Sequence, residues 1–194
     1  MIGLEVLLFM MPIVLAGMTN MGWVKLPIVK RNRVAMDGGR CWRDGKPVFG
    51  ANKTWAGFWG MIVFAGFWFG MMGIAAENWD WLNRHSLLPW DEFSPGSEWL
   101  YGMLWGFAYV LFELPNSFIK RRIDIAPGQN DRGLKGLFFT MMDQVDSVIG
   151  CILATYVFYH PSIMEVVLFL VIGSLIHYVV NVLLYVMKLK NQAR

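Results

Sequence analysis

The sequence predicts an all-α integral membrane protein with five transmembrane helices, an N-terminus outside the cell and a cytoplasmic C-terminus. Of its 194 residues, 56% are hydrophobic and only 16% are charged, whereas charged residues make up roughly 25% of soluble chains. So few charged side chains could not cover the surface of a water-soluble domain. A transmembrane helix needs about 20 mainly apolar residues. Five such stretches follow one another, in residues 2–23, 55–76, 99–119, 137–159 and 162–187. We therefore treat residues 1–194 as one membrane-embedded domain.

The five stretches differ in what interrupts their apolar character. The first contains Pro12, and we expect it to be an anchor because it lacks the positive start and the small-residue cleavage site of a signal peptide. The second carries no charge. The third contains Glu113, and the fourth contains Asp143 and Asp146. Because an aspartate within a membrane helix costs roughly 2.5–3.5 kcal/mol on insertion scales, these carboxylates are candidates for function.

The lysine and arginine residues predict the orientation, because cytoplasmic loops of membrane proteins carry an excess of them. Of the 17 basic residues, all except Arg84 fall in residues 24–54, 120–135 and 188–194. Five spans place these three regions on one side of the membrane and the acidic loop 77–98 on the other. We therefore expect a basic cytoplasmic face that attracts nucleotides and anionic lipid head groups. Nucleic acid is not an expected partner, because no soluble domain is present to hold it.

Asp143 and Asp146 form the first candidate site, one or two turns into an apolar helix. Their spacing of three residues places both carboxylates on one helix face. Two ionised carboxylates so close together repel each other unless a cation neutralises them. Such oxygen ligands suit Mg²⁺, which combines one or two carboxylates with water and substrate phosphates. The alternative is that each carboxylate pairs with a lysine or arginine of a neighbouring helix.

Residues 113–122 (ELPNSFIKRR) form the second candidate site. We expect Pro115 to interrupt the helix that carries Glu113, because proline removes a backbone donor. Asn116 and Ser117 would then line a polar cavity at membrane depth. Phosphate groups suit the three cations that follow, Lys120, Arg121 and Arg122. The alternatives are that these cations only flank the membrane and that Glu113 is a structural partner for one of them.

The loop before the second apolar stretch forms the third candidate site, which includes Asp37 and residues 49–57 (FGANKTWAG). Backbone N–H groups and the helix dipole at such a helix start favour a phosphate. The loop is not a nucleotide-binding P-loop, because Lys53 follows its glycines two residues too late. The alternative is a simple turn before a helix. The candidate phosphate contacts in the run are Gly50, Asn52, Lys53, Thr54 and Gly57.

Together, these regions resemble the CDP-archaeol synthase family, part of a wider superfamily of membrane CTP transferases that includes phosphatidate cytidylyltransferase. The resemblance rests on residues 49–57, residues 113–122, Pro127-Gly128 and residues 143–146 (DQVD), which occur in the family's order. It covers nearly the whole chain. Gln144 stands where phosphatidate cytidylyltransferases carry arginine, and Ala126-Pro127 stand in place of their Lys-Asp pair. Both departures favour the archaeol branch of the superfamily.

The resemblance implies a Mg²⁺-dependent cytidylyltransferase of the cell membrane, which joins CTP to a lipid phosphate and yields a CDP-lipid and pyrophosphate. The lipid would be an archaetidic-type diether or phosphatidic acid, and the oligomeric state stays open. Asp143 and Asp146 would hold the metal, and Lys120 and Arg121 would act in catalysis. The substrate contacts would be Gly50, Asn52, Lys53, Thr54, Gly57, Asn116, Ser117, Arg122, Glu113 and Asp37.

Three other functions compete with this one. A CDP-alcohol phosphotransferase needs the pattern Asp-Gly-x-x-Ala-Arg, but Asp37-Gly38 is followed by residues 39–42 (GRCW). An ion or proton transporter would use Asp143, Asp146 and Glu113 and would carry a flux without CTP. A membrane scaffold would tolerate loss of the Asp146 charge. None of the three accounts for all three candidate sites.

Overall fold

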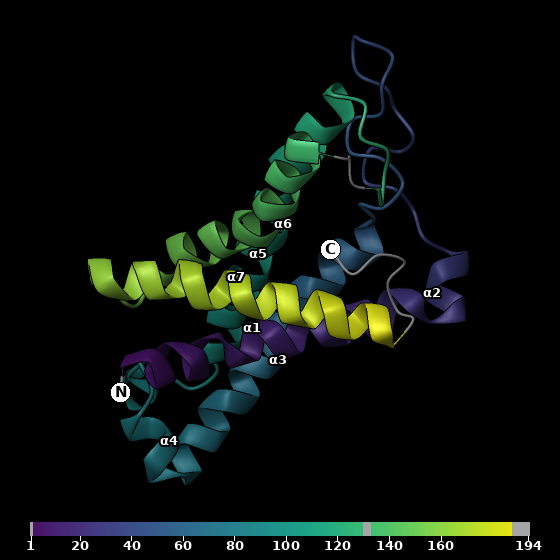
Figure 1. Cartoon of the computed structure of the whole chain (residues 1–194). Helices are drawn as coiled ribbons and strands as arrows, with labels where there is room; N and C mark the ends of the chain where they lie inside the picture. The colour runs from purple at the N-terminus through teal and green to yellow at the C-terminus, as the bar shows by residue number, and fades with distance from the viewer. Residues whose placement is uncertain (1, 130–132, 188–194) are drawn as a thin grey trace.

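Five long helices dominate the computed structural model, which describes residues 2–129 and 133–187 (Figure 1). No strand is present in these ranges, although single β-bridges join Ala35 to Thr54 and Cys41 to Pro47 in the first loop. The long helices are α1 (Ile2–Lys25), α3 (Trp55–Asn78), α5 (Ser97–Arg122), α6 (Gly133–Thr155) and α7 (Ile163–Val186). The short ones are α2 (Pro27–Arg31), α4 (Asp80–Arg84) and the 3₁₀ helix η1 (Trp90–Glu92).

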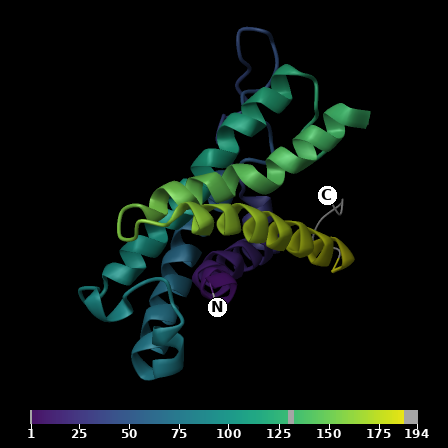
Figure 2. The same ribbon diagram turned by 60° about the vertical axis from the view of Figure 1, so that its left-hand side comes forward.

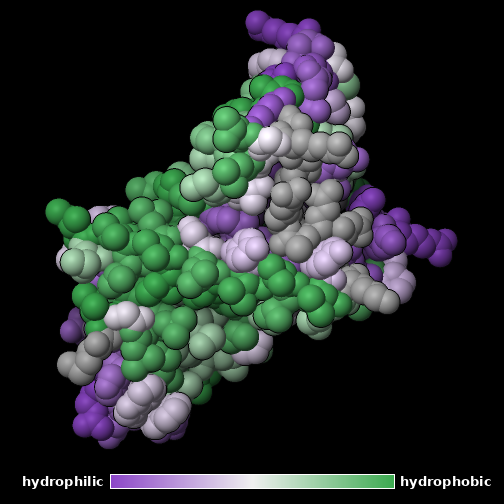
Figure 3. Space-filling view, viewed as in Figure 1, coloured by the Kyte–Doolittle hydropathy of each residue, from purple (hydrophilic) through white to green (hydrophobic). Residues whose placement is uncertain are grey.

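Each predicted apolar stretch forms one long helix. By length and composition, α1, α3, α6 and α7 could cross a membrane. Helix α5 is the longest of the five at 26 residues but carries Glu113, Pro115 and three cations, which lowers its hydropathy. Figure 3 shows the matching surface, with a broad hydrophobic band over α1 and α7 and hydrophilic residues toward both ends of the molecule. The protein is thus an all-helical membrane protein.

Glycine residues allow α3 and α5 to pack closely. A Cβ added at Gly102 would lie 2.6 Å from the carbonyl oxygen of Ala65, and one at Gly106 would lie 2.7 Å from that of Met61. Small residues let helix backbones approach in this way where no hydrophobic effect draws helices together within lipid. Aromatic side chains, with Trp105 and Phe69 fully buried, fill the space beside this contact. The pair therefore forms a rigid centre on which α1 and α6 pack.

Pro115 does not break its helix, contrary to expectation. Helix α5 continues through it to Arg122, so the prediction of an interrupted helix was wrong. Proline costs one backbone hydrogen bond, to the carbonyl of residue 111, but the turns that follow are held by side-chain bonds from Asn116 and Lys120 to α6. A helix in a membrane tolerates proline where neighbouring helices support it. As a result, Asn116 and Lys120 lie one turn apart on a continuous helix face.

The two basic loops meet at one end of the molecule. The Nζ of Lys46 lies 2.7 Å from a carboxylate oxygen of Asp124, and the Nε of Arg122 lies 3.1 Å from one of Asp44. The acidic loop between α3 and α5 lies at the opposite end (Figure 1). Arg132 and the basic residues 188–194, which also entered the orientation prediction, lie outside the described residues. The described part of the chain therefore separates basic and acidic loops as predicted.

Helices α6 and α7 diverge from the turn that joins them. In both ribbon views α6 rises with α5, whereas α7 runs beside α1 (Figures 1 and 2). The turn is fixed by a capping box, in which the Ser162 hydroxyl accepts from the backbone N–H of Glu165 while the Glu165 carboxylate accepts from the N–H of Ser162. Helix α6 therefore packs mainly on α5, and α7 contacts both α1 and α6.

Candidate active site

Asn116 on α5 joins the two aspartates of α6. Its Nδ2 donates to Oδ1 of Asp143 at 2.7 Å and to Oδ2 of Asp146 at 2.8 Å. Asp146 is buried, with 7% of its surface exposed, and its other oxygen accepts from the backbone N–H of Ser147 at 2.6 Å. The spacing of three residues on α6 therefore places both carboxylates on one face, as predicted, and Asn116 holds them together.

Lys120 pairs with one carboxylate only. Its Nζ lies 2.6 Å from Oδ1 of Asp143, and only 7% of the lysine surface is exposed. No lysine or arginine in residues 2–129 and 133–187 lies within ion-pair distance of Asp146. The sequence left two alternatives for the aspartates, a metal site or ion pairs with neighbouring cations, and the structure has features of both. Asp143 has the cationic partner expected of a structural ion pair, while Asp146 is a buried carboxylate without one.

The residues fit a magnesium ion. Two neighbouring carboxylates are oxygen ligands of the kind that Mg²⁺ prefers, and Mg²⁺ takes its remaining ligands from water and substrate phosphates. Within the described ranges no three His, Cys, Asp or Glu side chains cluster tightly enough to hold a metal by themselves. A buried carboxylate such as Asp146 is costly unless a positive charge accompanies it. A divalent ion shared by the aspartates and a phosphate would supply that charge.

The first loop reaches the same site through Lys53. This residue precedes α3, and its Nζ donates to Oε2 of Glu113 on α5. The two side chains are about equally shielded, at 24% and 23% exposure. Glu113 is therefore the structural partner of a cation, as one alternative held, although the cation is Lys53 rather than one of the three at the end of α5. Since Glu113 precedes Asn116 by about one turn, α5 connects all three predicted sites.

Asp37 organises the loop. One oxygen accepts from the N–H groups of Phe49 at 3.0 Å and Gly50 at 2.7 Å, and the other accepts from Gly39 at 3.0 Å. Burial on its own would raise the pKa of Asp37, but these backbone hydrogen bonds outweigh it and hold the pKa below the ordinary value. Both oxygens of Asp37 therefore hold the loop, while a contact of Asp37 with a substrate stays a prediction.

The turn at Gly50 requires glycine. Its φ is +92°, a left-handed conformation that side chains disfavour, and an added Cβ would lie 2.6 Å from Cγ of Pro127. A Cβ on Gly128 would lie 2.7 Å from Nδ2 of Asn52. The loop and the Pro127-Gly128 segment, two regions far apart in sequence, are therefore packed against each other beside the end of α5.

Thr54 begins α3 as its N-cap. Its hydroxyl oxygen accepts from the backbone N–H of Gly57 at 3.2 Å, which confirms the predicted helix start. The carbonyl of Gly57 accepts from Nδ2 of Asn20 on α1 at 3.0 Å. Sequence reasoning missed Asn20, although a polar residue within an apolar span signals a buried contact. These bonds fix the helix start relative to the site, while the role of Thr54 and Gly57 toward a substrate stays a prediction.

The three cations at the end of α5 have different surroundings. Arg122 donates to the carbonyl oxygens of Lys46 and Pro47 and stacks over the Phe118 ring at 4.6 Å, so its guanidinium holds the first loop. Arg121 is 7% exposed. Its Nε donates to the carbonyl of Ser117 at 3.4 Å, and its buried Nη1 has no hydrogen-bond partner among the described residues. Nη1 of Arg122 is likewise buried without a hydrogen-bond partner among the described residues, so both guanidinium groups keep a nitrogen that could bind a phosphate.

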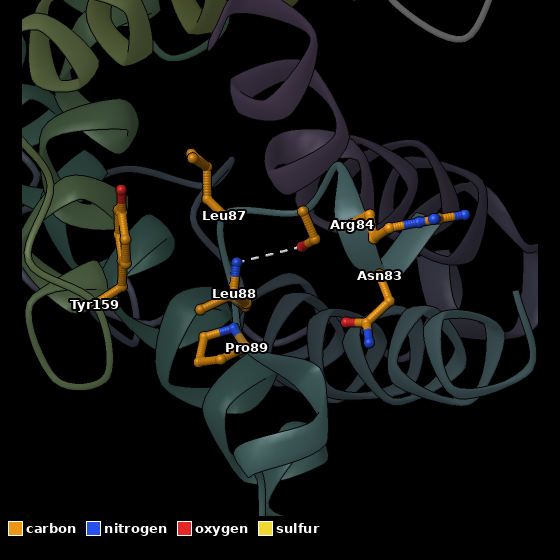
Figure 4. Close-up of a pocket in the computed structure, with 7 residues that line it drawn as sticks. Asn83, Arg84, Leu87, Leu88, Pro89 and Tyr159 are labelled. Atoms are coloured by element: carbon orange, nitrogen blue, oxygen red, sulfur yellow. Dashed lines mark hydrogen bonds between the residues drawn. The ribbon is translucent and has the colours of Figure 1, made fainter. Parts of the chain in front are cut away.

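A surface depression lies at the acidic end of the molecule, near α4 and away from Asp143 and Asp146. It has a volume of about 450 Å³ and is lined by residues 83–84, residues 86–89 and Tyr159 (Figure 4). The backbone N–H of Leu88 donates to the Ser86 hydroxyl at 3.2 Å, and Arg84 extends away from Tyr159. None of the predicted site residues lines this depression, and it holds no carboxylate pair. The candidate active site is therefore the one at the basic end.

Comparisons with known proteins identify the family of the chain. The family model that matches is described as CarS-like, CDP-archaeol synthase, and it matches residues 1–193. The CDP-archaeol synthase of Pyrococcus furiosus is 30% identical over 165 residues, which covers 85% of this chain and 86% of that protein. The CDP-archaeol synthase of Methanospirillum hungatei is 33% identical over 163 residues, which covers 80% and 87%.

One solved structure has the same fold. It is described as "Structural insight into an intramembrane enzyme for archaeal membrane lipids biosynthesis", and it superposes with a TM-score of 0.62 at 19% identity. The match covers 92% of this chain and 94% of that one. The arrangement of the long helices is therefore shared with a membrane-embedded enzyme.

Proposed function

Because the chain belongs to the CDP-archaeol synthase family, whose members are CTP-dependent cytidylyltransferases, we propose that it transfers CMP from CTP to a diether lipid phosphate. The products are a CDP-lipid and pyrophosphate. The observation that carries this proposal is the cluster in which Asn116 on α5 bridges Asp143 and Asp146 on α6, while Lys120 and Arg121 follow Asn116 on α5. It combines oxygen ligands for a metal with buried cations for phosphates, as phosphoryl transfer chemistry needs.

The reaction follows from charge and position. A non-bridging oxygen of the lipid phosphate attacks the α-phosphorus of CTP, and the bond from that phosphorus to the β-phosphate oxygen breaks to release pyrophosphate. No general base is needed, because a phosphate monoester is already largely ionised near pH 7. Asp143 and Asp146 would hold Mg²⁺, which when bound would neutralise charge on the phosphates. The chain's own groups position the two substrates, so most of the rate enhancement comes from orientation and electrostatics.

Each residue of the cluster has a distinct task in this scheme. Asp143 and Asp146 supply the metal ligands, and Asn116 keeps them in register. Lys120 and Arg121 hold phosphate oxygens, and the unpaired Nη1 of Arg121 supports this role. Lys53, just before α3, contacts Glu113, which supports a role for Lys53 in holding the nucleotide. Arg122 and Asp37 act indirectly, since they hold the loop that carries Lys53.

The membrane arrangement is part of the proposal. Five spans, with α5 as the third, place the N-terminus outside and the active site toward the cytoplasm, where CTP is made. The joined basic loops at the site end support this orientation under the positive-inside rule. The polar side chains of α5 support its place as a span, because intramembrane charges face a bundle interior and pair with one another.

A transporter built on the same carboxylates is not favoured. Glu113 is neutralised by Lys53 and Asp143 by Lys120, which leaves one unpaired carboxylate rather than a relay of three. The family assignment also points to a transferase.

The deciding experiment is pyrophosphate release by the purified, detergent-solubilised protein with CTP and Mg²⁺. The lipid panel would contain diether, diacyl and polyprenyl phosphates, with Asp146→Asn run in parallel. We expect release with the diether phosphate and none with the variant. Faster turnover of the diacyl phosphate would overturn the diether assignment. A lack of release with every lipid, together with a lack of CTP binding, would overturn the function.

A further inference from the structure

Polar side chains of α7 contact α6 at Gln144, which directly follows Asp143 of the candidate active site. The Nδ2 of Asn181 donates to Oε1 of Gln144 at 3.4 Å, and the Ser174 hydroxyl donates to the backbone carbonyl of Gln144 at 3.5 Å. Gln144 and Asn181 are both buried, at 7% and 6% exposure. Within lipid, such polar bonds and close packing hold helices together, because no hydrophobic effect does so. These bonds therefore help to fix how α7 lies on α6.

The two contacts reach opposite ends of Gln144. A backbone carbonyl of an α-helix points toward the C-terminus of that helix, whereas a side chain leans toward the N-terminus. Helix α7 runs back from the turn that follows α6 (Figures 1 and 2), so Ser174 meets the carbonyl and Asn181, about two turns later, meets the amide. The Nε2 of Gln144 has no hydrogen-bond partner among the described residues. The position of the Gln144 amide therefore depends on Asn181.

Gln144 and the two aspartates lie on different sides of α6. Because successive residues of an α-helix are about 100° apart around the axis, Gln144 points at nearly a right angle to Asp143 and lies almost opposite Asp146. Asn116 on α5 holds the aspartate side of α6, and Asn181 on α7 holds the Gln144 side. Bonds on two sides of a helix fix its rotation about its own axis, which a bond on one side does not. The direction of the carboxylates thus depends on both neighbouring helices.

We propose that Asn181 is a positioning residue for the metal site, which holds Gln144 and thereby fixes the rotation of α6 that presents Asp143 and Asp146 to a divalent ion. This inference rests on the proposed function, which uses that ion. A carboxylate about 5 Å from the helix axis moves by about 1 Å when the helix turns by about 10°. Functional groups must stay within about 0.5 Å of their productive positions. A small rotation of α6 is therefore enough to weaken metal binding.

Asn181→Ala tests this role, with Leu183→Ala as the matched control. Leu183 lies on the same helix but is 48% exposed. We expect Asn181→Ala to raise the Mg²⁺ concentration for half-maximal pyrophosphate release about tenfold, the low end of the effect of residues that support metal ligands. The control should match wild type. A second readout is the binding of Mn²⁺, which carboxylates also suit, in the absence of substrates. Electron paramagnetic resonance of the free ion measures it, and the dissociation constant should rise by the same factor.

A double variant separates positioning from a loss of stability. If Asn181 acts through Gln144, Gln144→Ala should shift the Mg²⁺ midpoint by the same factor, and the combination of both changes should add nothing further. Ser174→Ala removes only a hydroxyl group and should show the effect in weaker form, which covers failure of the Asn181 variant to fold. A merely structural role would lower the unfolding temperature and the maximal rate but leave the midpoint unchanged.

The outcomes distinguish this inference from the proposed function. A Mg²⁺ midpoint or a Mn²⁺ affinity equal to wild type in both Asn181→Ala and Ser174→Ala overturns the positioning role. Shifts that multiply in the double variant overturn it too, because Asn181 would then act independently of Gln144. Absence of pyrophosphate release by wild type with every lipid overturns the proposed function instead. In that case the Mn²⁺ affinities alone decide whether Asn181 positions the aspartates.

Discussion

The ammonium group of Lys120 lies 2.6 Å from Oδ1 of Asp143, between helices α5 and α6. This ion pair neutralises one aspartate, while the adjacent Asp146 has no lysine or arginine within ion-pair distance in the described part of the chain. A phosphate that enters the site would compete with Asp143 for the ammonium group and leave the carboxylate free for a metal. We therefore expect Lys120 to contact a phosphate and Asp143 to contact a metal ion when the substrates are bound.

Removing the charge of Asp146 should abolish turnover. We expect Asp146→Asn to lower the rate of pyrophosphate release at least about 100-fold, because it deletes a metal ligand and electrostatic groups of this kind contribute on that scale. Asp143→Asn should have a comparable effect. The matched control is Asp124→Asn, which removes an exposed carboxylate paired with Lys46 and should stay near wild type. A wild-type rate for either site variant would contradict the metal assignment.

Loss of Asn116 should weaken metal binding rather than lipid binding. Asn116→Ala removes both hydrogen bonds that hold the aspartates in register, and the loss of such supporting bonds typically costs 10–100-fold in metal affinity. We expect the Mg²⁺ concentration for half-maximal rate to rise by about that factor, with partial recovery of the rate at high Mg²⁺. The measurement is a Mg²⁺ titration of pyrophosphate release. An unchanged titration midpoint with a lower maximal rate would place Asn116 on a substrate instead.

Substitutions of Lys53 and Glu113 should affect CTP binding differently, although the two residues form one ion pair. Lys53→Ala removes a cation expected to meet the nucleotide, so we expect KM for CTP to rise about tenfold, as for one charge-assisted contact. Glu113→Gln leaves that cation in place and should change KM for CTP by less. Calorimetric titration with CTP measures both affinities directly. If Lys53→Ala binds CTP as wild type does, the first loop is not part of the nucleotide site.

Asp37 should stabilise the loop in a pH-dependent way. Its carboxylate accepts three backbone hydrogen bonds that lower its pKa below 3.8, so the ionised form favours folding. That contribution is complete well above the ordinary pKa and is lost as the pH falls through the lower, folded-state pKa. Asp37→Asn should therefore lower the unfolding temperature by a few degrees near pH 7, and the difference from wild type should shrink below pH 4. A difference that stays constant with pH would contradict this origin.

The orientation can be tested with the protein's own thiols. Cys41 is exposed in the first loop and Cys151 is buried on α6, so one reactive thiol is expected. In intact cells a membrane-impermeant maleimide should label Cys41 only after the membrane is opened. In a Cys41→Ser background, Ser94→Cys in the exposed acidic loop should be labelled without opening. Labelling of Cys41 in sealed cells would reverse the orientation.

The sequence by itself determined the membrane class, the five long helices, the helix start at Thr54 and the shared face of Asp143 and Asp146. These features depend on hydropathy and on spacing along a single helix, which are local properties. It also indicated, through residues 49–57 and 113–122, which regions meet at the site.

Only the tertiary structure decided how the charges pair. The sequence could not predict that Lys53 would meet Glu113, that Asn116 would bridge both aspartates, or that Arg122 would hold the first loop. Nor could it predict that α5 would continue through Pro115. Each outcome depends on which side chain of a neighbouring element lies within about 3 Å, the reach of a hydrogen bond. Helix packing sets that proximity, and no local pattern encodes it.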